Sequence, residues 1–169
     1  MTQETIAFIG GGNMATSLIA GLVADGQDPL RLVVSDPEKD KRDALMSRFG
    51  VRAIDDNAEA IRGADLAVLC VKPQMAARVC REVALAMQER RPLVVSVMAG
   101  IRERSIQQWL GCSASLVRAM PNTPAMIQSG AIVLHATPET SVAQRDQAET
   151  ILRAGGLTRW VQSEEQMDA

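Results

Sequence analysis

Three consecutive glycines follow a short apolar run near the start of this 169-residue sequence. Gly10, Gly12 and Ala15 fit the pattern G-x-G-x-x-G/A, in which a strand turns into a helix that binds the diphosphate of a dinucleotide. The first glycine permits a tight turn, the second lets the backbone approach the diphosphate, and the small third residue lets the helix pack on the strand. Asp36 follows the next apolar run, where the pattern has an acidic residue for the ribose. The spacing predicts a dinucleotide site at a helix N-terminus, and a plain glycine-rich turn is the alternative.

Three further loops carry residue types that could line the same site. In Val71–Pro73, Lys72 would bring a cation beside phosphate or ribose oxygens. In Met98–Gly100, small residues would leave room for a flat ring. In Pro121–Pro124, two prolines would hold the amide and hydroxyl of Asn122-Thr123 in a fixed pose for hydrogen bonding. Each loop alone also suits a helix start, a turn or a rigid connector, but together they predict a groove for an extended cofactor at the carboxyl ends of parallel strands.

Short, mostly apolar runs predict the strands that position these loops. Leu66–Val71 is apolar without interruption, as expected in a parallel sheet whose strands are covered by helices on both faces. The predicted strands are Thr5–Ile9, Leu30–Val34, Val51–Ile54, Leu66–Val71, Leu93–Val97, Ser115–Met120, Ala131–Ala136 and Leu157–Val161. The loop 121–130 has no room for a crossover helix, so we expect the strand after it to be antiparallel to its neighbour. The predicted fold class is α/β, a Rossmann-like, doubly wound and mostly parallel sheet with an antiparallel strand near the C-terminus.

Helical periodicity fills the segments between these strands. After Pro73, apolar residues recur every four positions and predict a core-facing stripe of Met75, Val79, Val83 and Met87. Asp56 or Asn57 is expected to cap a short helix, and Thr140 or Ser141 a later one. Ser163–Gln166 has the form of a capping box, which predicts a further helix start. We therefore expect residues 1–162 to form an NAD(P)-binding Rossmann domain and residues 163–169 to begin a C-terminal helical domain that this chain lacks.

Composition narrows the function classes. The sequence is 47% hydrophobic and 22% charged, which is typical of a globular protein and argues against disorder. With a net charge of −2, no basic stripe and few aromatic residues, nucleic acid is not an expected partner. No apolar run approaches the length of a membrane span. Three cysteines without C-x-x-C spacing and the lone His135 predict neither a metal site nor a catalytic triad, and we expect a cytoplasmic protein.

The most specific segments resemble one enzyme family. Ile9-Gly10-Gly11-Gly12-Asn13-Met14, Val71-Lys72-Pro73, Ala99-Gly100 and Arg118-Ala119-Met120-Pro121-Asn122-Thr123-Pro124 are similar to pyrroline-5-carboxylate reductase. The resemblance implies NAD(P)H-dependent reduction of the ring C=N bond of 1-pyrroline-5-carboxylate to L-proline. It also implies a homodimer or higher homo-oligomer, whose helical domain holds the substrate, so no catalytic residue is assigned in this chain. The expected cofactor-binding residues are Ile9, Gly10, Gly11, Gly12, Asn13, Met14, Ala15, Ser35, Asp36, Asn57, Val71, Lys72, Pro73, Met98, Ala99, Gly100, Asn122, Thr123 and Pro124.

Two questions stay open at this level. The cofactor domain of a β-hydroxyacid dehydrogenase or of another imine reductase, and a non-catalytic NAD(P)-sensing module, are the alternative functions. The cofactor is NADP(H) or NAD(H), because Asp36 favours a free ribose 2′-OH while nearby Ser35, Lys39, Lys41 and Arg42 could offset its charge. We therefore expect both cofactors to bind.

Overall fold

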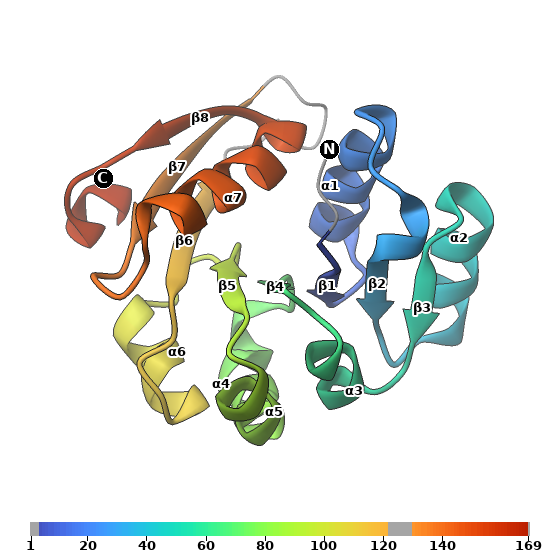
Figure 1. Cartoon of the computed structure of the whole chain (residues 1–169), viewed down its shortest axis with the longest axis horizontal. Helices are drawn as coiled ribbons and strands as arrows, with labels where there is room; N and C mark the ends of the chain where they lie inside the picture. The colour runs from blue at the N-terminus through green and yellow to red at the C-terminus, as the bar shows by residue number, and fades with distance from the viewer. Residues whose placement is uncertain (1–3, 122–129, 169) are drawn as a thin grey trace.

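An open sheet with helices on both faces forms the protein (Figure 1). The computed structural model describes residues 4–121 and 130–168. Within these residues the sheet has eight strands in the order β3-β2-β1-β4-β5-β6-β7-β8. The strands are β1 (Ile6–Ile9), β2 (Leu32–Ser35), β3 (Arg52–Ile54), β4 (Leu66–Leu69), β5 (Leu93–Ser96), β6 (Leu116–Pro121), β7 (Gly130–Ala136) and β8 (Gly156–Trp160).

Neighbouring strands are parallel except β6 and β7. In that antiparallel pair Arg118 lies opposite His135. β8 is parallel to β7, so both of the last strands run against the others. The predicted Rossmann-like, mostly parallel sheet with an antiparallel strand near the C-terminus is confirmed, and the reversal extends to β8 as well.

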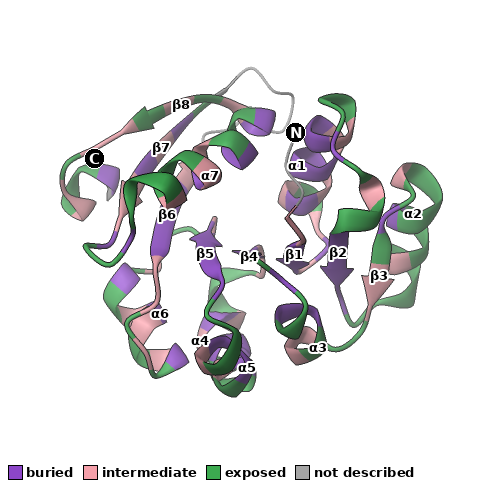
Figure 2. Cartoon of the chain, in the orientation of Figure 1, coloured by how far each residue is buried: buried purple, intermediate pink, exposed green. Residues whose placement is uncertain are grey.

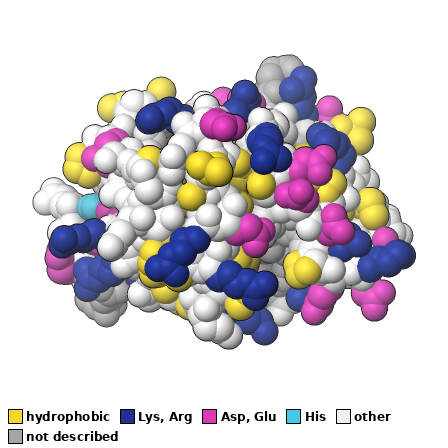
Figure 3. Space-filling model, turned by 90° about the horizontal axis from the view of Figure 1, so that it is seen from below, with side chains coloured by type: hydrophobic (Ala, Val, Ile, Leu, Met, Phe, Trp, Pro, Cys, Tyr) yellow, Lys and Arg dark blue, Asp and Glu magenta, His cyan; other side chains and the backbone are white. Residues whose placement is uncertain are grey.

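The helices form a layer on each face of the sheet. They are α1 (Asn13–Ala24), α2 (Lys39–Phe49), α3 (Asn57–Arg62), α4 (Ala76–Glu82), α5 (Ala84–Arg90), α6 (Glu103–Leu110) and α7 (Val142–Leu152), with 3-10 turns η1 (Pro29–Arg31), η2 (Pro73–Met75), η4 (Arg153–Gly155) and η5 (Glu164–Asp168). Buried residues of α1, α2 and α7 join one apolar cluster, and those of α3 to α6 join another on the opposite face. Figure 2 shows the central strands buried, the outer strands β3 and β8 partly exposed, and the helices exposed on their outer sides. Figure 3 looks onto the α3–α6 side, where basic and acidic side chains are interspersed.

Two predicted strands differ from the structure by two residues at one end, and the other described strand ends differ by at most one residue. The strand predicted from Leu30 begins at Leu32, because Pro29–Arg31 forms η1 and the side chain of Asp28 accepts the N–H of Leu30 at 3.0 Å. The strand predicted over Leu66–Val71 ends at Leu69, because the neighbouring strand β1 ends at Ile9 and the chain turns away there.

The segment after Pro73 is a 3-10 turn followed by two short helices rather than one continuous helix. The break is at Val83, whose φ and ψ are −97° and 4°. The N–H of Val83 donates to the carbonyl oxygen of Val79, and the N–H of Met87 donates to that of Val83, so helical hydrogen bonding continues through the break. Val79, Val83 and Met87 are buried and Met75 is partly buried, which confirms the predicted core stripe.

Side chains cap the helices close to the predicted places. Asp56, rather than Asn57, accepts the N–H of Glu59 at 3.0 Å. Ser141 and Gln144 form a reciprocal capping box at the start of α7. At the end of the chain Gln166 Oε1 accepts the N–H of Ser163 at 3.1 Å, and the turn that follows is the 3-10 helix η5. Among the described residues, no helix is both long and apolar enough to cross a membrane.

Candidate functional site

The chain leaves β1 through a tight turn at Gly10, whose φ is +104°. The N–H of Gly10 donates to the carbonyl oxygen of Ser35 at 2.8 Å. A Cβ atom added to Gly10 would lie 2.9 Å from the carbonyl oxygen of Cys70. The ends of β2 and β4 thus close around this residue, and its backbone conformation favours glycine. The turn that the sequence predicts at the first glycine is present.

The next positions of the pattern have the surroundings that a diphosphate site requires. Gly12 is the N-cap of α1, and a Cβ atom added there would meet nothing within 4 Å. Having no side chain, Gly12 supplies no cap to the first N–H groups of the helix, and such N–H groups attract anions. Ala15 is fully buried in the core cluster, where a larger side chain would separate α1 from the sheet.

A cavity of about 440 Å³ lies beside this turn, where β1, β2 and β4 end. The predicted site residues that line it are Gly10, Gly12, Ser35, Asp36, Asn57, Val71 and Lys72. The lining residues that the sequence did not assign to the site are Pro37, Glu38, Lys41, Asp55, Cys70, Met75, Arg78, Val79 and Glu82. Met75, Arg78 and Glu82 follow Lys72 at helical spacing. The helical periodicity after Pro73 could therefore have predicted that they line the same cavity as Lys72.

Asp36 is held by the backbone on two sides. Its residue exposure is 6%, Oδ2 accepts the N–H of Gly11 at 2.9 Å, and Oδ1 accepts the N–H of Glu38 at 2.8 Å. The carboxylate therefore ties the glycine turn to the segment that leads into α2. Two basic residues lie nearby in the sequence. Lys41 lines the cavity, and its Nζ lies 3.3 Å from Glu38 Oε2. The Arg42 guanidinium donates to the carbonyl oxygens of Asp36 and Pro37.

Asn57 is oriented by a chain of hydrogen bonds. The hydroxyl of Ser35 donates to Asn57 Oδ1 at 2.6 Å, and Asn57 Nδ2 donates to Glu82 Oε1 at 2.9 Å. Since Asp56 caps α3, the Asn57 side chain is available for this role. The three residues come from β2, α3 and α4, and all line the cavity.

The remaining predicted site residues lie elsewhere or outside the described part of the chain. Ile9 is buried in the sheet, Asn13 is exposed at the start of α1, and Met14 packs partly against the core. Met98 is 2% exposed and packs into the core, whereas Ala99 and Gly100 are exposed in the β5–α6 loop. Asn122, Thr123 and Pro124 lie outside the described residues.

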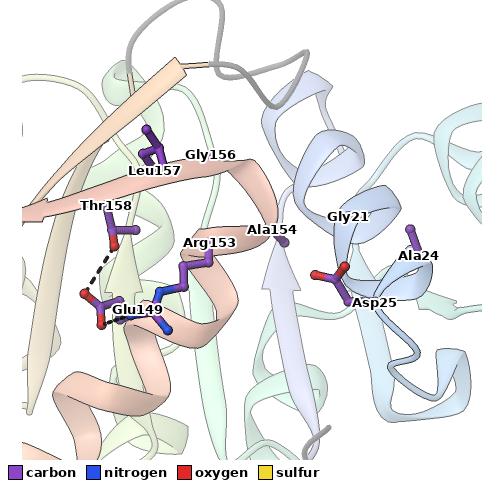
Figure 4. A pocket seen from close by; sticks show the side chains of 9 residues that line it. All are labelled: Gly21, Ala24, Asp25, Glu149, Arg153, Ala154, Gly156, Leu157 and Thr158. Atoms are coloured by element: carbon purple, nitrogen blue, oxygen red, sulfur yellow. Dashed lines mark hydrogen bonds and ion pairs between the residues drawn. The ribbon is translucent and has the colours of Figure 1, made fainter.

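A second cavity, of about 590 Å³, lies at the other end of α1, against η4 and β8 (Figure 4). Glu149 projects there and accepts hydrogen bonds from Thr158 at 3.1 Å and Arg153 at 2.8 Å. None of the predicted site residues lines this cavity, which lies at the opposite end of α1 from the glycine turn.

The cysteines do not add nucleophilic chemistry to the site. Burial raises the pKa of the Cys80 thiol to about 11 and raises the pKa of Cys70 as well. Both thiols therefore stay protonated near neutral pH. Among the residues that the structure covers, no cluster of histidine, cysteine and carboxylate side chains could hold a metal ion.

Along its whole length the chain is similar to known pyrroline-5-carboxylate reductases. It is 43% identical over 169 residues to a pyrroline-5-carboxylate reductase of Pseudomonas aeruginosa, and 38% identical to one of Haemophilus influenzae. The chain covers 62% of the length of each relative. A solved pyrroline-5-carboxylate reductase structure from Coxiella burnetii is 41% identical, with a TM-score of 0.96 over 99% of this chain and 62% of that one. These matches confirm the resemblance seen in the sequence.

More distant structures share the fold alone. A prephenate dehydrogenase of Aquifex aeolicus has a TM-score of 0.81 at 13% identity. The family model described as "NADP oxidoreductase coenzyme F420-dependent" matches residues 5–100, which include the glycine turn, Asp36, Asn57 and Lys72. Because this match covers more than half of the sequence, the chain belongs to the family of NADP oxidoreductases that this model describes.

Proposed function

We propose that this chain is the NAD(P)H-binding part of a pyrroline-5-carboxylate reductase, which reduces the ring C=N bond of 1-pyrroline-5-carboxylate and forms L-proline. The observation that carries the proposal is the glycine turn beside the cavity, with open space over Gly12 and uncapped N–H groups at the start of α1. The identity of 43% to a relative of that name supports the substrate. The bound nicotinamide supplies the hydride, so the task of this chain is to bind the cofactor and orient it.

In this proposal each loop has a separate role. The first turn of α1 binds the diphosphate, and Lys72 adds a cation at the edge of the cavity. Asp36 and Asn57 bind the ribose, and the loop Met98–Gly100 lies on the nicotinamide side together with Asn122–Pro124. Residues 1–162 would form the cofactor domain, and a separate helical domain would bind the substrate and join two subunits. The greater length of the relatives supports this division, since the chain spans 62% of them.

We also propose that the protein works in the cytoplasm as a homodimer or a higher homo-oligomer. Cys70, Cys80 and Cys112 are free thiols in the structure, as is usual in a reducing compartment. Sedimentation of a chain that includes the helical domain tests the oligomer.

The 169-residue chain is expected to bind NADH without turning over 1-pyrroline-5-carboxylate. Orientation of the reactants accounts for ~7–11 kcal/mol of the barrier in well-ordered sites, and one domain leaves the substrate unoriented. NADH oxidation measured with the imine substrate checks this, with the full-length Pseudomonas aeruginosa relative as positive control. Rapid turnover by the chain alone would contradict the two-domain proposal, and failure to bind any dinucleotide would contradict the cofactor proposal.

Replacing Asp36 is expected to shift cofactor preference toward NADPH. At ~5 Å and an effective dielectric of ~20, its charge opposes a 2′-phosphate by on the order of a few kcal/mol before screening. In Asp36→Ser we expect the ratio of NADPH to NADH dissociation constants to fall at least about tenfold, since tenfold corresponds to ~1.4 kcal/mol. Because Gly11 and Glu38 also lose their acceptor, affinity for both cofactors should drop.

A second variant is the control, because it should shift the cofactor preference in the opposite direction, toward NADH. Lys41 lines the same cavity as Asp36 and would attract a 2′-phosphate there, so Lys41→Gln should weaken NADPH binding more than NADH binding. Calorimetric titration of both variants with both cofactors measures the two ratios. A ratio that stays constant in Asp36→Ser would rule out Asp36 as the residue that reads the 2′ position.

A further inference from the structure

Four ionisable side chains from separate elements meet beneath the C-terminal turn, outside the cavity described above. They are Glu103 at the start of α6, Arg118 on β6, His135 on β7 and Glu164 at the start of η5. Arg118 Nη1 lies 3.0 Å from Glu164 Oε2, and His135 Nδ1 lies 2.5 Å from Glu103 Oε2. The Arg118 side chain is 1% exposed and the others are at most 17% exposed. Each acid is thus paired with a base in a nearly dry environment.

Glu164 also completes the N-terminus of α6. The N-cap residue of that helix is Arg102, and its side chain makes no capping hydrogen bond. Instead Glu164 Oε2 accepts the N–H of Glu103 at 2.7 Å, although the two residues are 61 positions apart. A carboxylate at this place satisfies a backbone donor and complements the positive end of the helix dipole.

The pairs depend on one another because they are buried together. Burial raises the pKa of the Glu103 carboxyl, the His135 hydrogen bond and charge oppose this, and the Glu164 charge adds to it. Arg118 is a countercharge to both acids, because it contacts Glu164 directly and its charge lowers the pKa of Glu103. Removing Glu164 would leave the Arg118 guanidinium without this partner in a buried place, which is costly.

Two of these four residues, Arg118 and Glu103, lie next to the ends of the loop that joins β5 to α6. Arg118 pairs in the sheet with Ser96, the last residue of β5, and Ser96 Oγ accepts the N–H of Met98 at 3.3 Å. Glu103 lies at the other end of the same loop. Residues 97–102 are therefore fixed at one end by Ser96 and at the other by the Glu164 carboxylate, with exposed Ala99 and Gly100 between them.

We propose that Glu164 is a positioning residue for the nicotinamide side of the cofactor site, acting with Arg118 through the N-terminus of α6 on loop 97–102. This inference rests on the proposed function, because it takes Ala99 and Gly100 to lie next to the nicotinamide. In this proposal the turn η5 affects cofactor binding indirectly: Glu164 acts on the loop and not by direct contact with the cofactor.

The test compares NADH with ADP-ribose, which carries the same adenosine and diphosphate but no nicotinamide. We expect Glu164→Ala to weaken NADH binding about tenfold, the size of one charge-assisted hydrogen bond, while ADP-ribose changes less than about twofold. Glu164→Gln keeps an oxygen for the Glu103 N–H but loses the charge, so its effect should be intermediate. Glu165→Ala alters the exposed neighbour and is the matched control, with no change expected for either ligand.

Hydrogen exchange gives a readout that does not need a cofactor. In Glu164→Ala we expect faster exchange at the amides of residues 97–104 and unchanged exchange in β1 and α1. Equal losses for NADH and ADP-ribose, or an unchanged affinity for NADH, would overturn the positioning role. If the unsubstituted chain bound neither ligand, the proposed function would fail and this role with it, while the exchange data would still report whether Glu164 holds the loop.

Discussion

A Gly12→Val variant is expected to fold like the unsubstituted chain and to bind NADH and NADPH at least about a hundredfold more weakly. The branched side chain would occupy the space where the diphosphate must approach the backbone. Excluding the diphosphate removes several charge-assisted hydrogen bonds, each worth ~1.5–3 kcal/mol, and ~2.7 kcal/mol already corresponds to a hundredfold change. Calorimetric titration with both cofactors measures the loss.

The structure explains why this variant should still fold. Gly12 has a φ of −81°, which any residue adopts, and its added Cβ atom meets no protein atom within 4 Å. The remaining cost is a poorer N-cap residue, ~1 kcal/mol. Gly63→Val is the matched control, because Gly63 also has negative φ and open surroundings but does not line the cavity. Undiminished affinity in a folded Gly12→Val protein would refute the diphosphate assignment.

The order and type of the elements could be predicted because the information is local. Runs such as Ile6–Ile9 and Leu66–Leu69 are apolar at every position, as buried parallel strands require. The missing crossover after β6 correctly predicted the antiparallel partner. The η1 turn at Pro29–Arg31 was not predicted, although its signal is local: Asp28 caps the turn and Pro29 begins it. The break at Val83 was not predicted either, since apolar residues at helical spacing continue through it.

Part of the candidate site is also local in the sequence. The glycine turn is encoded in consecutive residues, and the structure places it beside the expected cavity. The hydrogen bond from Gly11 to Asp36 and the chain from Ser35 through Asn57 to Glu82 join residues from separate elements, which spacing alone does not reveal. The charge pair of Arg118 and Glu164 is of the same kind, with 46 positions between its members.

A Gly10→Ala variant is expected to lose stability rather than cofactor contacts, although it lies two residues from Gly12. At a φ of +104°, a side chain adds strain of ~1–3 kcal/mol. Its Cβ atom would also lie 2.9 Å from the Cys70 carbonyl oxygen, so the backbone of β1 or β4 must shift. Such overpacking typically costs a further ~1–3 kcal/mol. At ~2–4 °C per kcal/mol for a chain of this size, the melting temperature should fall by about 10 °C.

Gly50→Ala separates the two causes of this loss. Gly50 has a φ of +74°, but its added Cβ atom would meet only Pro29 at 3.9 Å, an ordinary contact. This control carries the strain of a positive φ without the overlap, so its melting temperature should fall by only a few degrees, in proportion to ~1–2 kcal/mol. Thermal unfolding followed by circular dichroism compares the two variants. If Gly10→Ala were no less stable than Gly50→Ala, the close approach of Cys70 could not be what requires glycine at the start of the turn.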